Sequence, residues 1–148
     1  MATLRMDHIS VVVSDLESAK AFFTELGMEF VGEADIQGEW VDRINAIDDL
    51  HCRIAMMKTP DGSGQLELTQ FSNPLAINPE AASAPPNALG LRSVMFEVDD
   101  VDTTVARLQM MGGSLVGEIV NYETYYRLCY LRGPDGIIVS LAEPLGQD

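Results

Sequence analysis

His8 opens the segment HISVVVSDLESAKAFF, and its imidazole is a side chain that can bind a metal ion, carry a proton or simply lie at the surface. The segment recurs later in the chain as SVMFEVDDVDTTVARL, with the same apolar spacing and the same acidic turn. In this second copy, Ser93 takes the place of the histidine. A serine hydroxyl forms hydrogen bonds but is rarely deprotonated enough to bind a metal ion well. We therefore expect the two copies to differ in chemistry.

The apolar spacing predicts a strand followed by a helix in each copy. In the first, Ile9, Val11 and Val13 alternate with residues of the opposite strand face, and Ser14 is predicted as the helix N-cap with Glu17 completing a capping box. The predicted helix has apolar residues at Leu16, Ala19, Phe22, Phe23 and Leu26, and it ends at Gly27. The second copy repeats the pattern from residue 93 to 112, so the chain contains an internal repeat.

The segments RIAMMKTPDG and RLCYLRGPDG extend the repeat. Each PDG predicts a tight turn between two strands, because proline sets φ and glycine accepts a positive φ. The segments LELTQF and IIVSLAE are then the last strands of their copies. Each copy is predicted to be a βαβββ module, with a first module at 1–73, a Pro- and Ala-rich linker at 74–90 and a second module at 91–148. The fold class is therefore α+β.

Composition excludes several classes of protein. With 9 basic and 23 acidic residues, the net charge of −14 argues against binding to nucleic acid or anionic lipid. No apolar run approaches the roughly 18 residues of a membrane-spanning helix, and no apolar signal core precedes the first strand. Cys52 and Cys129 form no CxxC motif, so neither a disulfide framework nor a structural zinc site is expected. We expect a cytoplasmic protein whose partner is a small molecule or a second copy of itself.

The doubled βαβββ pattern with its two PDG hairpins resembles the vicinal oxygen chelate superfamily, which includes glyoxalase I, extradiol dioxygenases and bleomycin-binding proteins. The resemblance spans Met6 to Leu145. It implies that the two modules form a cup-shaped mixed sheet with the helices on the outside. In that family, side chains from the first and last strands of each module hold a divalent metal ion inside the cup.

The resemblance carries the metal-ligand positions of the family to His8 and Glu67 in the first copy and to Ser93 and Ser140 in the second. Zinc prefers about four nitrogen, sulfur or carboxylate ligands, so the two serines leave its site incomplete. We expect that zinc does not bind tightly and that a divalent ion such as Mg, Mn, Ca, Fe or Ni binds weakly to His8 and Glu67. The same resemblance makes His8 and Glu67 the catalytic candidates, with Glu67 as a metal ligand or a general base.

Further side chains are expected to face the cup. Residues two apart on a strand share a face, which places Met95 with Ser93. The strands before the PDG turns are apolar on both faces, and the family's arrangement turns their Met and Tyr side chains inward. The expected substrate-binding residues are Ser93, Ser140, Tyr126, Tyr130, Met56 and Met95. Packing in the core is the alternative role for these Met and Tyr side chains.

The sequence is compatible with two functions. The first is a lyase or isomerase of the glyoxalase or epimerase kind, in which a metal ion polarises a carbonyl group and a carboxylate moves a proton beside it. The second is a metal-free binding protein of the bleomycin-resistance kind, whose apolar cup sequesters a hydrophobic or cationic compound. A fold alone does not decide between them.

We predict a homodimer, because each module leaves one face of its sheet open and is too small to be stable alone. The linker is long enough for the modules to pair within one chain or between two. Light scattering at micromolar protein concentration checks the prediction, and the mass of a monomer would contradict it.

Overall fold

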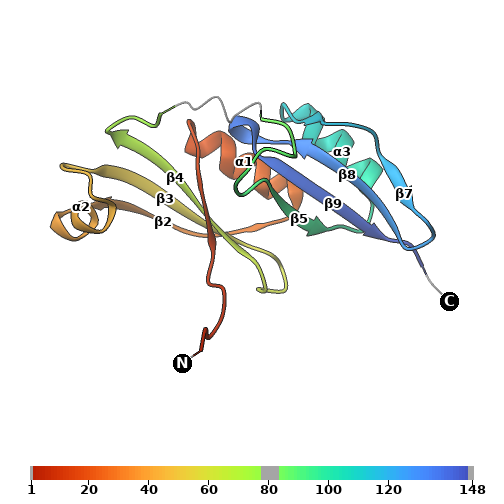
Figure 1. Ribbon diagram of the computed structural model, residues 1–148, viewed down its shortest axis with the longest axis horizontal. Helices are drawn as coiled ribbons and strands as arrows, with labels where there is room; N and C mark the ends of the chain where they lie inside the picture. Colours follow the sequence, from red (N-terminus) through yellow and green to blue (C-terminus); the bar gives the residue numbers. More distant parts are fainter. Residues whose placement is uncertain (1, 78–83, 147–148) are drawn as a thin grey trace. The chain divides into compact units, whose positions relative to one another are not determined.

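Two βαβββ modules make up the structure, a computed structural model that describes residues 2–77 and 84–146 (Figure 1). The chain divides into one unit at Met1–Ile77 and a second at Asn78–Asp148. Of the linker predicted at 74–90, residues 78–83 lie outside the described part. None of the helices within the described ranges is long and apolar enough to cross a membrane.

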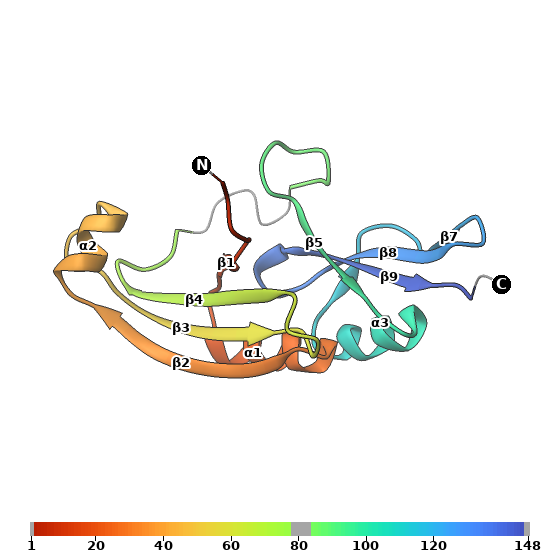
Figure 2. The same ribbon diagram turned by 90° about the horizontal axis from the view of Figure 1, so that it is seen from below.

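The first module contains β1 (Ile9–Val12), α1 (Leu16–Leu26), β2 (Glu29–Gln37), α2 (Glu39–Asn45), β3 (His51–Lys58) and β4 (Gln65–Asn73). Its sheet has the order β1-β4-β3-β2, and β1 runs parallel to β4 while the other pairs are antiparallel. Helix α1 contacts β2, β3 and β4 and lies across one face of the sheet (Figure 2). The first and last strands of the module are therefore neighbours.

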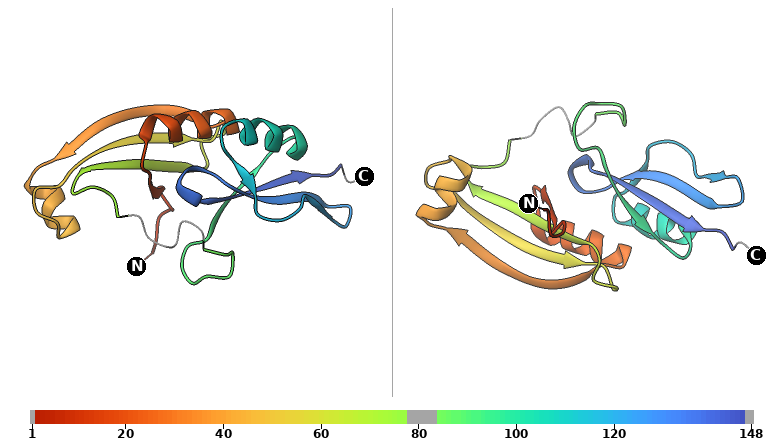
Figure 3. Two further views of the ribbon diagram at one scale, coloured as in Figure 1. Left: turned by 90° about the horizontal axis from the view of Figure 1, so that it is seen from above. Right: turned by 60° about the horizontal axis from the view of Figure 1, so that its bottom comes forward.

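The second module repeats this arrangement with β5 (Ser93–Glu97), α3 (Val101–Met110), β6 (Ser114–Leu115), β7 (Val120–Tyr122), β8 (Tyr126–Arg132) and β9 (Ile138–Pro144). Strand β5 runs parallel to β9, and β8 pairs antiparallel with β9, β6 and β7. The second PDG forms a short 3₁₀ turn at Pro134–Gly136. Helix α3 packs on one side of this sheet (Figure 3). Where the first module has the single strand β2 after its helix, the second has the two short strands β6 and β7.

Each helix buries the apolar positions that the periodicity predicted. In α1 these are Leu16, Ala19, Phe22 and Phe23, and in α3 they are Val101, Val105 and Leu108. The sheet residues facing α1 are also buried, among them Ala55, Met57, Leu66 and Leu68. Each helix and the sheet face beneath it form the core of their module. The opposite face, which we call the site face, carries the candidate functional residues.

The prediction of Ser14 as the N-cap of α1 is wrong, because Asp15 is the N-cap. Asp15 has an extended backbone (φ −138°), and its carboxylate accepts a hydrogen bond from the Ser18 amide at 3.0 Å. The strand pairing continues past β1 through the Val13 amide, which donates to the Thr69 carbonyl at 2.8 Å. The strand thus reaches Val13 as predicted, and the helix N-cap lies one residue later than predicted. A carboxylate at this position is also favoured by the helix dipole.

Helix α2 is an insertion that the second module lacks in the described residues, and it packs at one end of the first sheet (Figure 2). Val41, Leu50 and Cys52 form a buried cluster here, against which Ile36, Ile47, Ile54 and Phe71 pack. Ile54 pairs with Thr69 across the strands, so this cluster lies on the site face. The insertion thus covers one end of that face.

Gly113, after α3, leaves no room for a side chain. A Cβ atom there would lie 2.8 Å from Leu131 Cδ2 and 2.9 Å from the Leu108 carbonyl oxygen. We expect Gly113→Ala to lower the free energy of unfolding by about 1–3 kcal/mol through overpacking. Gly117→Ala is the matched control, because nothing lies within 4 Å of its added Cβ, and it should change the stability by less than about 0.5 kcal/mol. Urea denaturation measures both, and equal effects would contradict the packing explanation.

Candidate functional site

The parallel pairing of β1 and β4 brings His8 and Glu67 together. In the register of this pair, Ser10 lies opposite Glu67, and His8 precedes Ser10 by two residues on the same side of the chain. Leu66 and Leu68 point toward α1, so Glu67 between them points to the site face. His8 Nε2 lies 3.5 Å from Glu67 Oε2. The two predicted metal ligands of the first module are therefore adjacent in space.

Asp7 holds the other nitrogen of the His8 ring. Its Oδ2 atom lies 2.8 Å from His8 Nδ1, and its Oδ1 atom accepts a hydrogen bond of 2.6 Å from the Arg5 guanidinium. The hydrogen bond to His8 and, secondarily, the charge of Arg5 lower the pKa of Asp7 from its ordinary value. Asp7 is therefore an anion behind the histidine, on the side away from Glu67.

Two hydroxyl groups hold the other oxygen of Glu67. Ser10 Oγ donates to Glu67 Oε1 at 3.2 Å, and Thr69 Oγ1 donates to the same oxygen at 3.3 Å. Thr69 is a buried polar residue on the same strand face, so its hydroxyl has a fixed position. Oε1 is thereby occupied, and Oε2 remains the oxygen that faces His8.

These contacts fit a pair of ligands for a divalent cation. The separation of 3.5 Å exceeds an ordinary N–H···O hydrogen bond. Two ligand atoms each about 2.1 Å from one ion and at the tetrahedral angle lie about 3.4 Å apart, which is close to this separation. A carboxylate on the far nitrogen of a histidine is also the usual outer partner of a metal ligand. Within the described residues of the first module, His8 and Glu67 supply two ligands, fewer than a tight zinc site requires.

Apolar residues follow on the site face from Glu67 toward α2. Met56 lies directly opposite Glu67 on β3, so the register places the methionine on the site face. Cys52, further along β3, is buried beneath α2. Burial raises the pKa of the Cys52 thiol, and the negative charge of Glu67 raises it further. Cys52 is therefore a protonated, inert thiol close to the carboxylate, as its role as a small apolar residue requires.

The second module places serines and an aromatic residue at the equivalent positions. Ser140 on β9 lies between Met95 on β5 and Tyr130 on β8, just as Glu67 lies between Ser10 and Met56. Ser140 is 1% exposed, whereas Met95 and Tyr130 are 58% and 41% exposed. Ser93 opens β5 on the same face. The four residues predicted here are thus brought together, without a carboxylate or an imidazole among them.

Tyr126 lies at the far end of this face. It opens β8 and pairs with Tyr122 of β7, and it is 40% exposed. The rings of Tyr122 and Tyr125 are 5.9 Å apart. Tyr126 and Tyr130 are four residues apart, with Leu128 between them on the same strand face, so this strand contributes two aromatic side chains to the face.

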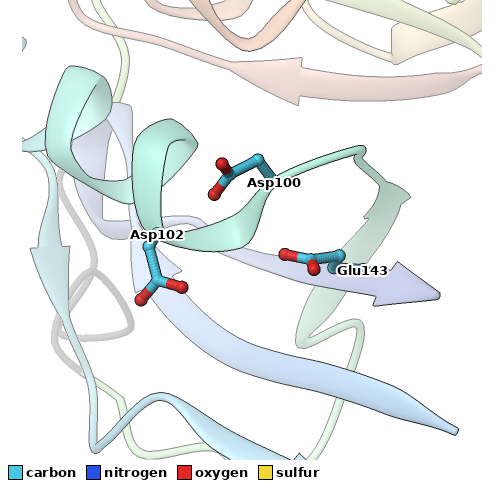
Figure 4. A group of neighbouring side chains, drawn as sticks. All are labelled: Asp100, Asp102 and Glu143. Atoms are coloured by element: carbon cyan, nitrogen blue, oxygen red, sulfur yellow. The ribbon is translucent and has the colours of Figure 1, made fainter. Parts of the chain in front are cut away.

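A second acidic group, Asp100, Asp102 and Glu143, has carboxylate oxygens within 4.8 Å of one another in the second module (Figure 4). Each member has a structural partner. Asp100 caps α3 by accepting from the Thr103 amide, Glu143 accepts from the Val101 amide at 2.8 Å, and Asp102 pairs with Arg127. The Arg127 guanidinium lowers the pKa of Asp102.

A residue of the first module makes the same contact as Glu143, at the start of α1. Gln70 follows Glu67 by three residues, as Glu143 follows Ser140, and its amide oxygen accepts a hydrogen bond from the Leu16 amide at 2.8 Å. A neutral amide therefore performs the same task as Glu143. The charge of Glu143 is not needed for the contact, so we assign Asp100 and Glu143 to helix capping and Asp102 to the ion pair with Arg127.

The contacts of Asp7 and Thr69 were not predicted from the sequence. Asp7 is adjacent to His8, but its contact depends on how the segment before β1 bends. Thr69 shares a strand face with Glu67 two residues away, a signal that was present in the sequence. Both support the predicted pair without being ligands themselves.

Comparison with known proteins agrees with this architecture. The family model described as Glyoxalase/Bleomycin resistance protein/Dioxygenase superfamily matches residues 5–141. A glyoxalase family protein from Bacillus cereus of known crystal structure is 47% identical, with a TM-score of 0.94, over 99% of this chain and 97% of its own. TnmS3, an antibiotic binding protein from Streptomyces sp. CB03234, is 27% identical, with a TM-score of 0.60, over 97% of this chain and 98% of its own.

A relative is also found among bacterial proteins known by sequence. The uncharacterized protein YaeR of Escherichia coli (strain K12) is 29% identical over 139 residues, which cover 94% of this chain and 95% of YaeR. The family match spans nearly all of both modules. The chain therefore belongs to the glyoxalase/bleomycin resistance protein/dioxygenase superfamily, as its doubled βαβββ pattern and paired PDG turns predicted.

Proposed function

We propose that this protein is a small-molecule enzyme of lyase or isomerase type, acting in the cytoplasm, in which His8 and Glu67 hold a divalent cation weakly. One observation carries the proposal: His8 Nε2 and Glu67 Oε2 face each other at 3.5 Å, while their other atoms are held by Asp7, Ser10 and Thr69. These contacts orient His8 Nε2 and Glu67 Oε2 toward the same space.

A divalent cation bound by these residues would polarise a carbonyl oxygen of the substrate. The contribution of the chain itself centres on Glu67. Because Ser10 and Thr69 occupy Oε1, only Oε2 is available, either as a cation ligand or as the acceptor of a proton from a carbon beside the carbonyl group. The two roles of Glu67 compete for one oxygen. This competition favours an ion that exchanges readily over one that is bound tightly.

The proposed substrate-binding surface consists of Met56 in the first module and Ser93, Met95, Tyr126, Tyr130 and Ser140 in the second. Methionine and tyrosine side chains supply apolar contact area, and the hydroxyl groups supply hydrogen bonds. A small apolar molecule with a carbonyl group fits this chemistry. We further propose that the protein is a homodimer in which modules pair to cover their site faces.

A binding protein without catalysis is the second candidate, and the similarity to the antibiotic binding protein TnmS3 supports it. The second-module face, with Met95, Tyr126 and Tyr130 partly exposed, suits a hydrophobic ligand. Proton exchange distinguishes the two functions. An enzyme of the proposed kind should catalyse deuterium incorporation beside the carbonyl group of a small ketone or aldehyde in D₂O, followed by NMR, whereas a binding protein should not.

Calorimetric titration with Mn²⁺, Mg²⁺ and Zn²⁺ tests the cation site. We expect Glu67→Gln and His8→Ala to weaken Mn²⁺ binding by about 1–3 kcal/mol, since each loses a charged or strongly coordinating group. Ser93→Ala and Ser140→Ala should each cost about 1 kcal/mol or less, because a serine offers only hydrogen bonds. Nanomolar Zn²⁺ binding by the wild type, or binding that only the serine variants abolish, would contradict the assignment.

Glu143→Gln is the matched control for the acidic group of the second module. Because Gln70 caps α1 with an amide, we expect this variant to retain both Mn²⁺ binding and, to within about 0.5 kcal/mol, the free energy of unfolding. Calorimetry and urea denaturation measure these quantities. If Glu143→Gln abolished cation binding while His8→Ala preserved it, the cation site would lie at the start of α3.

A further inference from the structure

We propose that Asp7 is a positioning residue that holds the imidazole of His8 in the tautomer with its proton on Nδ1, so that the lone pair of Nε2 faces Glu67. The inference deepens the proposed function, because that tautomer is the one in which Nε2 can bind a cation. It concerns a residue that contacts neither the cation nor the substrate in the proposed site.

The two carboxylates on either side of His8 compete for one proton. A neutral imidazole carries a proton on only one of its nitrogens, and the nitrogen with the better acceptor keeps it. Asp7 Oδ2 lies 2.8 Å from Nδ1, a normal hydrogen-bond length, whereas Glu67 Oε2 lies 3.5 Å from Nε2. The shorter contact favours Nδ1–H, and Nε2 is left as an acceptor.

Arg5 sets the direction of the Asp7 carboxylate. Its guanidinium donates to Oδ1 at 2.6 Å, which turns Oδ2 toward His8. The contacts therefore form a network from Arg5 through Asp7 and His8 to Glu67, which ends at the hydroxyl groups of Ser10 and Thr69. Each side chain in this network orients the next one. The side chains of Arg5 and Asp7 are 70% and 55% exposed, so they contribute orientation and little to folding.

Without Asp7, the tautomer should change. Glu67 would then be the nearest acceptor for the ring, and the proton would move to Nε2 to point at its carboxylate. A protonated Nε2 has no lone pair to offer a cation. Asp7 therefore prevents His8 and Glu67 from satisfying each other directly, and it keeps both available to a third atom between them.

Nitrogen-15 NMR of the histidine rings tests the tautomer in the cation-free protein. The chain has only two histidines, His8 and His51, so His51→Gln assigns both ring systems. At a pH at which both rings are neutral, the long-range proton–nitrogen pattern of wild-type His8 should report Nδ1–H. Asp7→Ala should shift the population toward Nε2–H. Asp7→Asn should restore the wild-type pattern only in part, because Arg5 and Nδ1–H then compete for its single amide oxygen.

Mn²⁺ titration provides the second measurement. We expect Asp7→Ala to weaken binding about tenfold, the usual lower end for loss of an outer partner of a histidine ligand. Asp48→Asn is the matched control for the loss of one negative charge, because Asp48 is an exposed acid in the turn between α2 and β3, and it should bind Mn²⁺ as the wild type does.

The outcomes separate this inference from the proposed function. A wild-type spectrum with the proton on Nε2, or a tautomer population that Asp7→Ala leaves unchanged, would overturn the role of Asp7. If the wild type shows the Nδ1–H form and Asp7→Ala removes it while no cation binds, then the positioning role holds and the proposed cation site fails. A loss of Mn²⁺ affinity in Asp48→Asn equal to that in Asp7→Ala would overturn positioning in favour of simple charge.

Discussion

The parallel pairing of the first and last strands in each module is the constraint on which the candidate site depends. A parallel pair needs a crossover connection, and α1 and α3 occupy the segments that follow β1 and β5. The pairing fixes the register Ser10 to Glu67 in one module and Met95 to Ser140 in the other. A shift by one residue would turn Glu67 toward α1 and bury a carboxylate in the core.

The last strand of each module serves both of its faces. On β4, Leu66 and Leu68 contribute to the core and Gln70 caps the start of α1, while Glu67 and Thr69 point to the site face. Strand β9 follows the same plan with Glu143 as the capping residue. The position of the helix and the position of the site are therefore set by alternate residues of one strand, which couples the helix start to the site geometry.

The two modules share the same strand pairing but carry different side chains at the equivalent positions of the site face. The first has a carboxylate beside an imidazole, whereas the second has a buried serine between a methionine and a tyrosine. Backbone pairing determines where these positions lie, but the side chains decide whether they attract a cation or an apolar group. A protein with one polar and one largely apolar face of this kind can use the first for chemistry and the second for binding.

Apolar periodicity, PDG turns and a repeated pattern are local signals, and they predict the modules, the helices with their buried faces and the turns. The pair His8 and Glu67 came from the family resemblance that this pattern carries. Tertiary structure decided what local signals leave open. Both faces of β3 and β8 are apolar, so only their pairing with β4 and β9 places Met56 and Tyr130 on the site face. The N-cap is Asp15 and not Ser14 because the Asp15 carboxylate reaches the Ser18 amide, and the contact of Asp7 with His8 depends on the bend of the chain before β1. His8 and Ser10, in contrast, reach Glu67 only because β1 pairs with β4. These features depend on contacts between segments far apart in sequence or on the bend of the chain, and neither is encoded in the spacing of residues along one segment.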